Sequence, residues 1–286
     1  MSTSFVAFLN MHGIACASDT DMTLYSLSQQ EPVALAVNSY SPIPWDSIIN
    51  SYLRQGEIAK HVVFGDYARD FSSYLSTIKI NPAWKKLTED DGNIIFLGFG
   101  TNDVFPSVVY IQVHLDDEAS KLTCDFNTER GIDHNNETDF YTLTHFENTQ
   151  SVIYGISDVA RTKLIEKQSA LVNIFKQRIL DAVKGTKFEE EVQKKLSEYD
   201  ATTTIAELTH YQSGVNLERI DMALDSFNVE DLVKVAEDFV DAKVQLDHLK
   251  SGGKGELPRT KELAVITRTE GVVYIKHCLY GLQFFE

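Results

Sequence analysis

Short apolar runs separated by turn residues dominate the start of the chain. Residues 4–9 and 14–18 form two such runs around a turn that carries Gly13, and this spacing predicts a strand hairpin. Residues 32–38 are almost continuously apolar, which is typical of a strand covered on both faces. The pattern then changes to a helical one over residues 45–53, so strands and helices belong to one compact fold.

The middle of the chain repeats this succession of elements. Residues 57–79 predict one or two helices. Apolar alternation then predicts five short strands, over residues 94–98, 108–115, 121–126, 141–146 and 151–156. The polar and acidic residues 127–140 predict a loop between two of them.

The last third of the chain is mainly helical and closes on strands. A long helix is predicted from Ser157 or Asp158 to Gly185, whereas residues 187–215 are charged and favour no regular element. Asn228 is a predicted N-cap, since the apolar residues after it recur at helical spacing. Residues 263–277 predict a closing hairpin.

The element order is strands, helices, strands, helices, strands, and it predicts a layered α+β architecture in which sheets pack against pairs of helices. The sequence contains no repeat and no linker that would separate two domains. We therefore expect a single domain over residues 1–286.

Composition narrows the classes of function. A net charge of −16 repels phosphate backbones and anionic membranes, so neither nucleic acid nor a membrane is an expected partner. The cysteines Cys16, Cys124 and Cys278 form no Cys-x-x-Cys pair, and the histidines show no metal-ligand spacing, so we expect no metal and no cofactor. Cys16 has the surroundings of a core residue. Without a secretion leader or a long apolar run, a cytoplasmic location is expected.

The residues that leave the first hairpin, Ala17-Ser-Asp-Thr-Asp-Met-Thr23, resemble a proteasome β-type subunit, in which Ala-x-Asp-x-Arg-x-Thr follows the same strand pair. The helix at 228–243 and the hairpin at 262–276 are similar to the last helix and strand pair of that family. Residues 98–107 and this hairpin also resemble an uncharacterised bacterial group of proteasome-like proteins with the N-terminal-nucleophile (Ntn) hydrolase fold. The resemblance implies a four-layer αββα sandwich of two antiparallel sheets flanked by helices, with a helical insertion over 187–225.

The resemblance also implies site residues. In an Ntn hydrolase a terminal Thr, Ser or Cys side chain attacks the substrate, and its own α-amine acts as the base. Alignment on Ala-x-Asp places the nucleophile on Thr3 and the orienting aspartate on Asp19. Removal of Met1 alone would expose Ser2 instead, so Ser2, Thr3 and Asp19 are the candidate catalytic residues.

The same stretch departs from the family in its charges. Asp21 stands where the family carries arginine, and Thr23-Leu-Tyr-Ser26 occupies the place of the family's lysine. No lysine or arginine precedes Arg54. Because a nearby positive charge or a helix N-terminus is what lowers the pKa of a nucleophile, the sequence favours a degraded threonine-peptidase site without enzymatic activity.

Three functions remain open. The leading hypothesis is a self-associating structural or partner-binding protein, because related folds pack into dimers or rings; a homo-oligomer is expected, with a further protein or a peptide as partner. The rival is an active Ntn-type amidohydrolase or peptidase that uses Ser2 or Thr3, with Asp19 as the orienting carboxylate. The third is a ligand-binding module that uses the cleft between the sheets.

Overall fold

The computed structural model describes residues 4–19, 22–28, 31–38, 41–55, 63–79, 81, 84, 92–116, 121–144, 158–198, 214, 217–250, 252 and 262–277. The chain divides into two compact units, one made of residues 1–145 with 221–286 and the other of residues 146–220. The expected insertion, 187–225, overlaps with the second unit, which begins earlier in the chain. A single domain over residues 1–286 stays a prediction.

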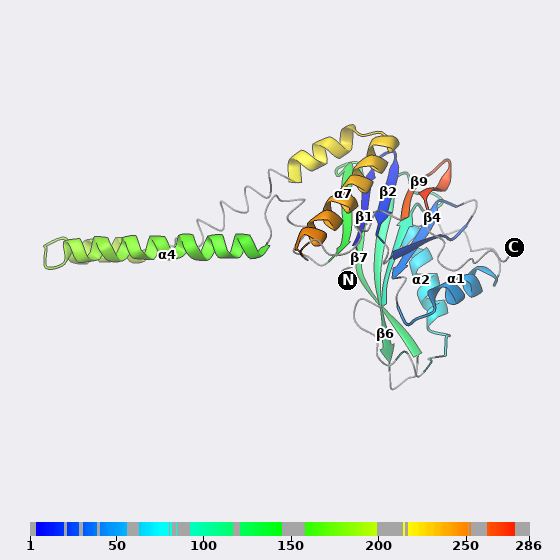
Figure 1. The fold of residues 1–286 in the computed structure, drawn as a ribbon, viewed down its shortest axis with the longest axis horizontal. Helices are drawn as coiled ribbons and strands as arrows, with labels where there is room; N and C mark the ends of the chain where they lie inside the picture. Colours follow the sequence, from blue (N-terminus) through cyan, green and yellow to red (C-terminus); the bar gives the residue numbers. More distant parts are fainter. Residues whose placement is uncertain are drawn as a thin grey trace. The chain divides into compact units, whose positions relative to one another are not determined.

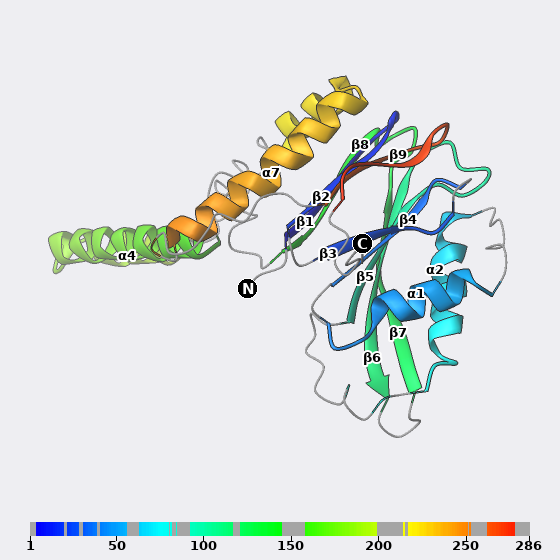
Figure 2. The same cartoon turned by 45° about the vertical axis from the view of Figure 1, so that its right-hand side comes forward.

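Two antiparallel sheets make up most of the first unit (Figures 1 and 2). Sheet A contains β1 (Ser4–Asn10), β2 (Gly13–Ser18), β8 (Thr138–Thr144), β9 (Glu262–Thr267) and β10 (Gly271–Lys276) in the order β10-β9-β2-β1-β8. Sheet B contains β3 (Met22–Ser26), β4 (Val33–Asn38), β5 (Asn93–Gly98), β6 (Ser107–Asp116) and β7 (Lys121–Gly131) in chain order. The protein is therefore of the α+β class.

The predicted N-terminal hairpin is confirmed as β1 and β2. Its register pairs Asn10 with Gly13 and Phe5 with Ser18. Gly13 is required at the turn, because a Cβ there would lie 2.5 Å from the carbonyl oxygen of Ile266 in β9. The hairpin is thus held on its β2 side by the closing hairpin of the chain.

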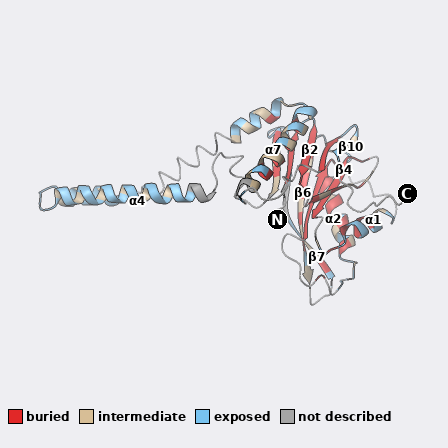
Figure 3. Ribbon diagram, in the orientation of Figure 1, coloured by how far each residue is buried: buried red, intermediate tan, exposed pale blue. Residues whose placement is uncertain are grey.

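Two apolar clusters lie on the two faces of sheet B. Ala34 and Ile95 belong to the cluster shared with β1, β2 and β9, which places that cluster between the sheets. Leu35 and Phe96 belong to the cluster that includes α1 (Trp45–Leu53) and α2 (Phe64–Leu75). Figure 3 shows the central strands as buried, and this confirms the prediction that residues 32–38 are covered on both faces.

The outer face of sheet A is covered by α7 (Val229–Lys250), which packs on β1, β2 and β9. Phe239 meets Phe8 of β1 edge to face, with ring centroids 5.8 Å apart. The predicted N-cap is confirmed, since the backbone N–H of Asp231 donates to Asn228 Oδ1 at 3.0 Å. Helices therefore lie on the outer face of each sheet (Figure 2).

One prediction about a polar segment was wrong. The loop expected over 127–140 is shorter, because β7 continues to Gly131 and β8 begins at Thr138. Strand β7 is at the edge of sheet B, where polar side chains reach solvent, so the strand lacks an apolar pattern.

The charged region over 187–215 contains a helix, α5 (Glu189–Glu198). The pattern of residues favoured no regular element there, whereas the resemblance implied a helical insertion over 187–225. Its three leading glutamates interact favourably with the positive end of the helix dipole. Glu191 and Lys195 form an i,i+4 ion pair at 3.2 Å. The helix before it is confirmed as α4 (Asp158–Val183), and the strand predicted over 151–156 lies outside the described residues.

Candidate functional site

The resemblance assigns the site to the end of sheet A where β1 begins and β2 ends. Asp19 directly follows β2 and is buried, with 6% of its surface exposed. Ser2 and Thr3 lie outside the described residues, as does Asp21. Of the three candidate residues, the structure therefore places Asp19, at the exit of β2.

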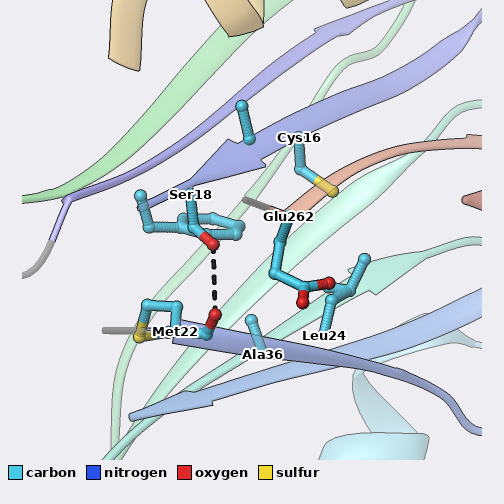
Figure 4. Close-up of a pocket in the computed structure, with 8 residues that line it drawn as sticks. Cys16, Ser18, Met22, Leu24, Ala36 and Glu262 are labelled. Atoms are coloured by element: carbon cyan, nitrogen blue, oxygen red, sulfur yellow. Dashed lines mark hydrogen bonds between the residues drawn. The ribbon is translucent and has the colours of Figure 1, made fainter. Parts of the chain in front are cut away.

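A narrow pocket lies between the two sheets at this end (Figure 4). It is lined by Phe5, Cys16, Ala17, Ser18, Met22, Leu24, Ala36 and Glu262. No lysine or arginine is among these described lining residues. Met22 and Leu24 of β3 belong to the apolar cluster between the sheets, and the packed side chains leave no room for a water molecule. In the proteasome-like family the corresponding strand carries a lysine. Here β3 instead contributes apolar side chains that fill the pocket.

Ser18 connects the two sheets at the pocket. Its hydroxyl lies 3.2 Å from the carbonyl oxygen of Met22 and 3.3 Å from that of Asp19, and Figure 4 shows the first of these bonds. Both neighbours are acceptors, so the hydroxyl donates its proton to the backbone. Ser18 is therefore a structural residue that joins the exit of β2 to the start of β3.

Glu262 is a pocket residue that the sequence analysis did not single out. It pairs with Ser18 across β2 and β9, and it points to the same side as Ala264 and Ile266, toward the space between the sheets. Only 3% of its surface is exposed. A charged residue at the head of the apolar run 263–267 was the available signal, but its inward direction depends on the register with β2, far away in the sequence.

The carboxylate of Glu262 has an imidazole neighbour. His277 Nδ1 lies 2.6 Å from Glu262 Oε2, and the His277 ring lies against the Tyr274 ring, with centroids 4.4 Å apart and planes tilted by 36°. The Tyr274 hydroxyl donates to the carbonyl oxygen of Leu24 at 3.2 Å, and burial raises the pKa of Tyr274 above its usual range. Tyr274 is thus neutral at pH 7 and holds β10 against β3.

Cys16 also lines the pocket, and it is confirmed as a core residue. Its Sγ lies 3.6 Å from the carbonyl oxygen of Ala264. Burial raises the pKa of Cys16 to about 12, and the Glu262 carboxylate acts in the same direction. Because the thiolate is the nucleophilic form, a thiol in this setting is inert near neutral pH.

A lysine or arginine from elsewhere in the fold would be needed to supply the positive charge that the residues before Arg54 lack. Among the described residues, the buried lysine is Lys243 on α7, in the helical stripe that includes Phe239 and Val240. That stripe packs on the outer face of sheet A, whereas the pocket opens on the inner face. The described lining of the pocket therefore combines the Glu262 carboxylate with backbone acceptors and contains no ammonium or guanidinium group.

The described residues lack two further kinds of feature. They contain no cluster of three or more His, Cys, Asp or Glu side chains that would hold a metal ion. Within the same residues, no helix has the length and apolar character needed to cross a bilayer.

Comparisons with known proteins give a faint likeness to a solved structure. No protein-family model matches the chain, and no curated protein matches it. Among solved structures, it is similar to the selenomethionine-labelled Anbu (Gly-1) mutant from Hyphomicrobium sp. strain MC1, at 18% identity and a TM-score of 0.29. The match covers 49% of this chain and 60% of that one, less than two thirds of its length. A TM-score this low assigns no function to the chain.

We expect the pairing of Glu262 with His277 to contribute measurably to stability. Replacing His277 by alanine leaves the buried carboxylate without its imidazole, so we expect the free energy of unfolding to fall by about 2 kcal/mol. The measurement is urea unfolding of H277A at pH 7. In a Glu262→Gln background the same replacement should cost at least about 1 kcal/mol less. Equal costs in the two backgrounds would show that the pair does not contribute.

Proposed function

We propose that the first unit is a four-layer αββα sandwich of the Ntn-hydrolase, proteasome-like type, and that the chain is a self-associating or partner-binding structural protein whose threonine-peptidase site is degraded. The support for the layers is the packing of α7 on sheet A, of α1 and α2 on sheet B, and of an apolar cluster between the sheets. Both ends of the described chain contribute strands to sheet A, as the resemblance implies.

The observation that carries the functional part is the composition of the pocket between the sheets. Ntn-type attack needs a group that lowers the pKa of the nucleophile and an open space for an acyl group. Here Met22 and Leu24 fill the space, Ser18 bonds to the backbone, and the charged lining residue is Glu262. A carboxylate raises the pKa of a neighbouring hydroxyl or amine, so it opposes activation.

A second candidate function is supported by Asp19. A buried carboxylate at the exit of β2 is the position that the resemblance gives to the orienting group of an active Ntn amidohydrolase. That activity would use the hydroxyl of Ser2 or Thr3 as nucleophile and the chain's own α-amine as base.

An experiment with an electrophile separates these two functions. We expect the intact mass of the native protein to remain unchanged on incubation with a peptide epoxyketone or β-lactone, because no activated terminal nucleophile is available. The same spectrum gives the terminal residue of the protein. A single stable adduct that maps to residue 2 or 3 and disappears in S2A or T3A would establish the amidohydrolase and overturn the proposal.

A further inference from the structure

The second unit contains a long helix with one partly buried side. α4 packs against α5, and the partly buried residues of α4 recur at helical spacing: Ile165, Ser169, Val172, Lys176, Leu180 and Val183. Glu189, Val192 and Leu196 are the partly buried residues of α5. This side is therefore the one that α4 uses within its own unit.

α4 has a second apolar side that is exposed. Four large residues along it, Leu164, Leu171, Phe175 and Ile179, are 41%, 54%, 59% and 45% exposed, and they are called the α4 stripe below. Ile174, which is 51% exposed, lies beside the stripe, about 60° from Leu171 around the helix. Each residue of the stripe precedes a partly buried residue by one position, so the two sides are about 100° apart on the helix. Figure 3 shows most of α4 as exposed. Two apolar sides at this angle are what a helix with two neighbours in a bundle presents.

The charge around the α4 stripe is opposite to that of the rest of the chain. Residues 158–187 contain seven Lys or Arg and three Asp or Glu. The remaining residues contain nineteen basic and thirty-nine acidic side chains. Lys167 and Arg178 flank the stripe, so a surface that covers it is favoured when it is acidic. Because the rest of the chain is acidic, a second copy of this chain offers such an acidic surface.

We propose that the α4 stripe is the docking surface for a second copy of this chain, held by apolar burial and by attraction between the basic helix and acidic residues of that copy. The inference rests on the self-association in the proposed function and names the surface that mediates it. Large apolar side chains exposed in a row along one helix are typical of protein interfaces, whereas scattered ones are not. The basic flank selects an acidic partner over a like-charged one.

The test compares two matched double variants of the full chain. Leu171→Gln with Phe175→Gln removes the centre of the stripe, keeps the charge and retains good helix formers. Asn173→Ala with Gln177→Ala changes two exposed residues about 200° away on the same helix. Sedimentation velocity from about 1 to about 100 μM gives the dissociation constant of self-association. We expect the stripe variant to raise it at least about tenfold and the control to leave it unchanged, with equal helix content by circular dichroism.

Each other outcome counts against the inference in a different way. A wild-type chain that is monomeric at about 100 μM removes the second copy as the occupant. A stripe variant that associates like the wild type leaves self-association intact but places it on another surface. A variant of unchanged mass and lower melting temperature shows that the chain covers the stripe itself. The electrophile experiment tests the loss of peptidase activity separately, so the two proposals fail independently.

Charge reversal provides a second readout of the same surface. Lys167→Glu with Arg178→Glu should weaken association at low ionic strength, and the difference from the wild type should shrink as added salt screens the charges. A weakening that is equal at all salt concentrations would contradict the electrostatic part of the inference.

Discussion

Replacing Asn10 by alanine is expected to lower the free energy of unfolding by about 3 kcal/mol. Asn10 is fully buried at the end of β1, and its Nδ2 donates to the carbonyl oxygens of Leu224 and Phe227 at 2.9 and 2.8 Å. Its Oδ1 accepts the backbone N–H of His12 at 2.9 Å. One side chain thus joins the β1–β2 turn to the segment that leads into α7, and alanine leaves all three backbone groups without this partner.

The measurement for Asn10 is urea unfolding followed by tryptophan fluorescence. Both tryptophans of the chain, Trp45 and Trp84, belong to the first unit and are buried, so their signal reports on that unit. The matched control is M11A, which truncates the exposed neighbour and should change stability by less than about 0.5 kcal/mol. A loss below about 1 kcal/mol in N10A would mean that water replaces the amide at no cost, and the account of this junction would be wrong.

Cys16 is expected to react with iodoacetamide at least about a thousandfold more slowly in the native protein than in the unfolded chain at pH 8. An ordinary thiol with a pKa of 9.0 is about one tenth thiolate at that pH, whereas a pKa of about 12 leaves roughly one part in ten thousand. Burial adds a steric barrier in the same direction. Peptide mapping by mass spectrometry gives the labelling rate of each cysteine.

Cys124 is the internal control for that experiment, because it is partly exposed and should be labelled faster than Cys16.

The direction of the Cys16 pKa shift also predicts a pH dependence of stability. The Cys16 pKa is higher in the folded than in the unfolded state, so the unfolded chain releases the proton first as the pH rises. Stability should therefore be lost between pH 9 and about pH 12, and C16A should lose less of it. Rapid native labelling of Cys16 at pH 8 would refute the closed pocket.

Elements with a strong apolar period were predicted from the sequence, and elements supported by charge were not. The strand over 32–38 and the helix after Asn228 have patterns that tertiary packing reinforces, and both are present. The pattern of residues did not indicate α5, although the resemblance implied a helical insertion there. Its stability comes from glutamates at its first turn and from a Glu191–Lys195 pair, which resemble a solvated loop in composition. The prediction ended the edge strand β7 at residue 126 rather than at Gly131, because its last residues are also polar or charged.

The candidate site shows a different limit of sequence reasoning. Asp19 was found because the residues around it carry a local pattern, and its place at the exit of β2 follows from the hairpin alone. Glu262 acquires its role from the register of β2 with β9, where Ser18 faces it. His277 is positioned by a second hairpin after that register is set. No residue spacing within the sequence indicates that Glu262 faces Ser18 or that His277 contacts Glu262.

The strand order of sheet A also has a consequence for how the protein is made. β2 lies between β1 and β9, so one edge of the first hairpin stays unpaired until about 240 further residues have been synthesised. At roughly 5 to 20 residues per second the ribosome needs about 12 to 50 s for this interval. During that time an apolar strand with free backbone donors and acceptors is available to other nascent chains. Newly made copies should therefore depend on chaperones that shield strand edges, and rapid overproduction should yield aggregates that begin with the N-terminal hairpin.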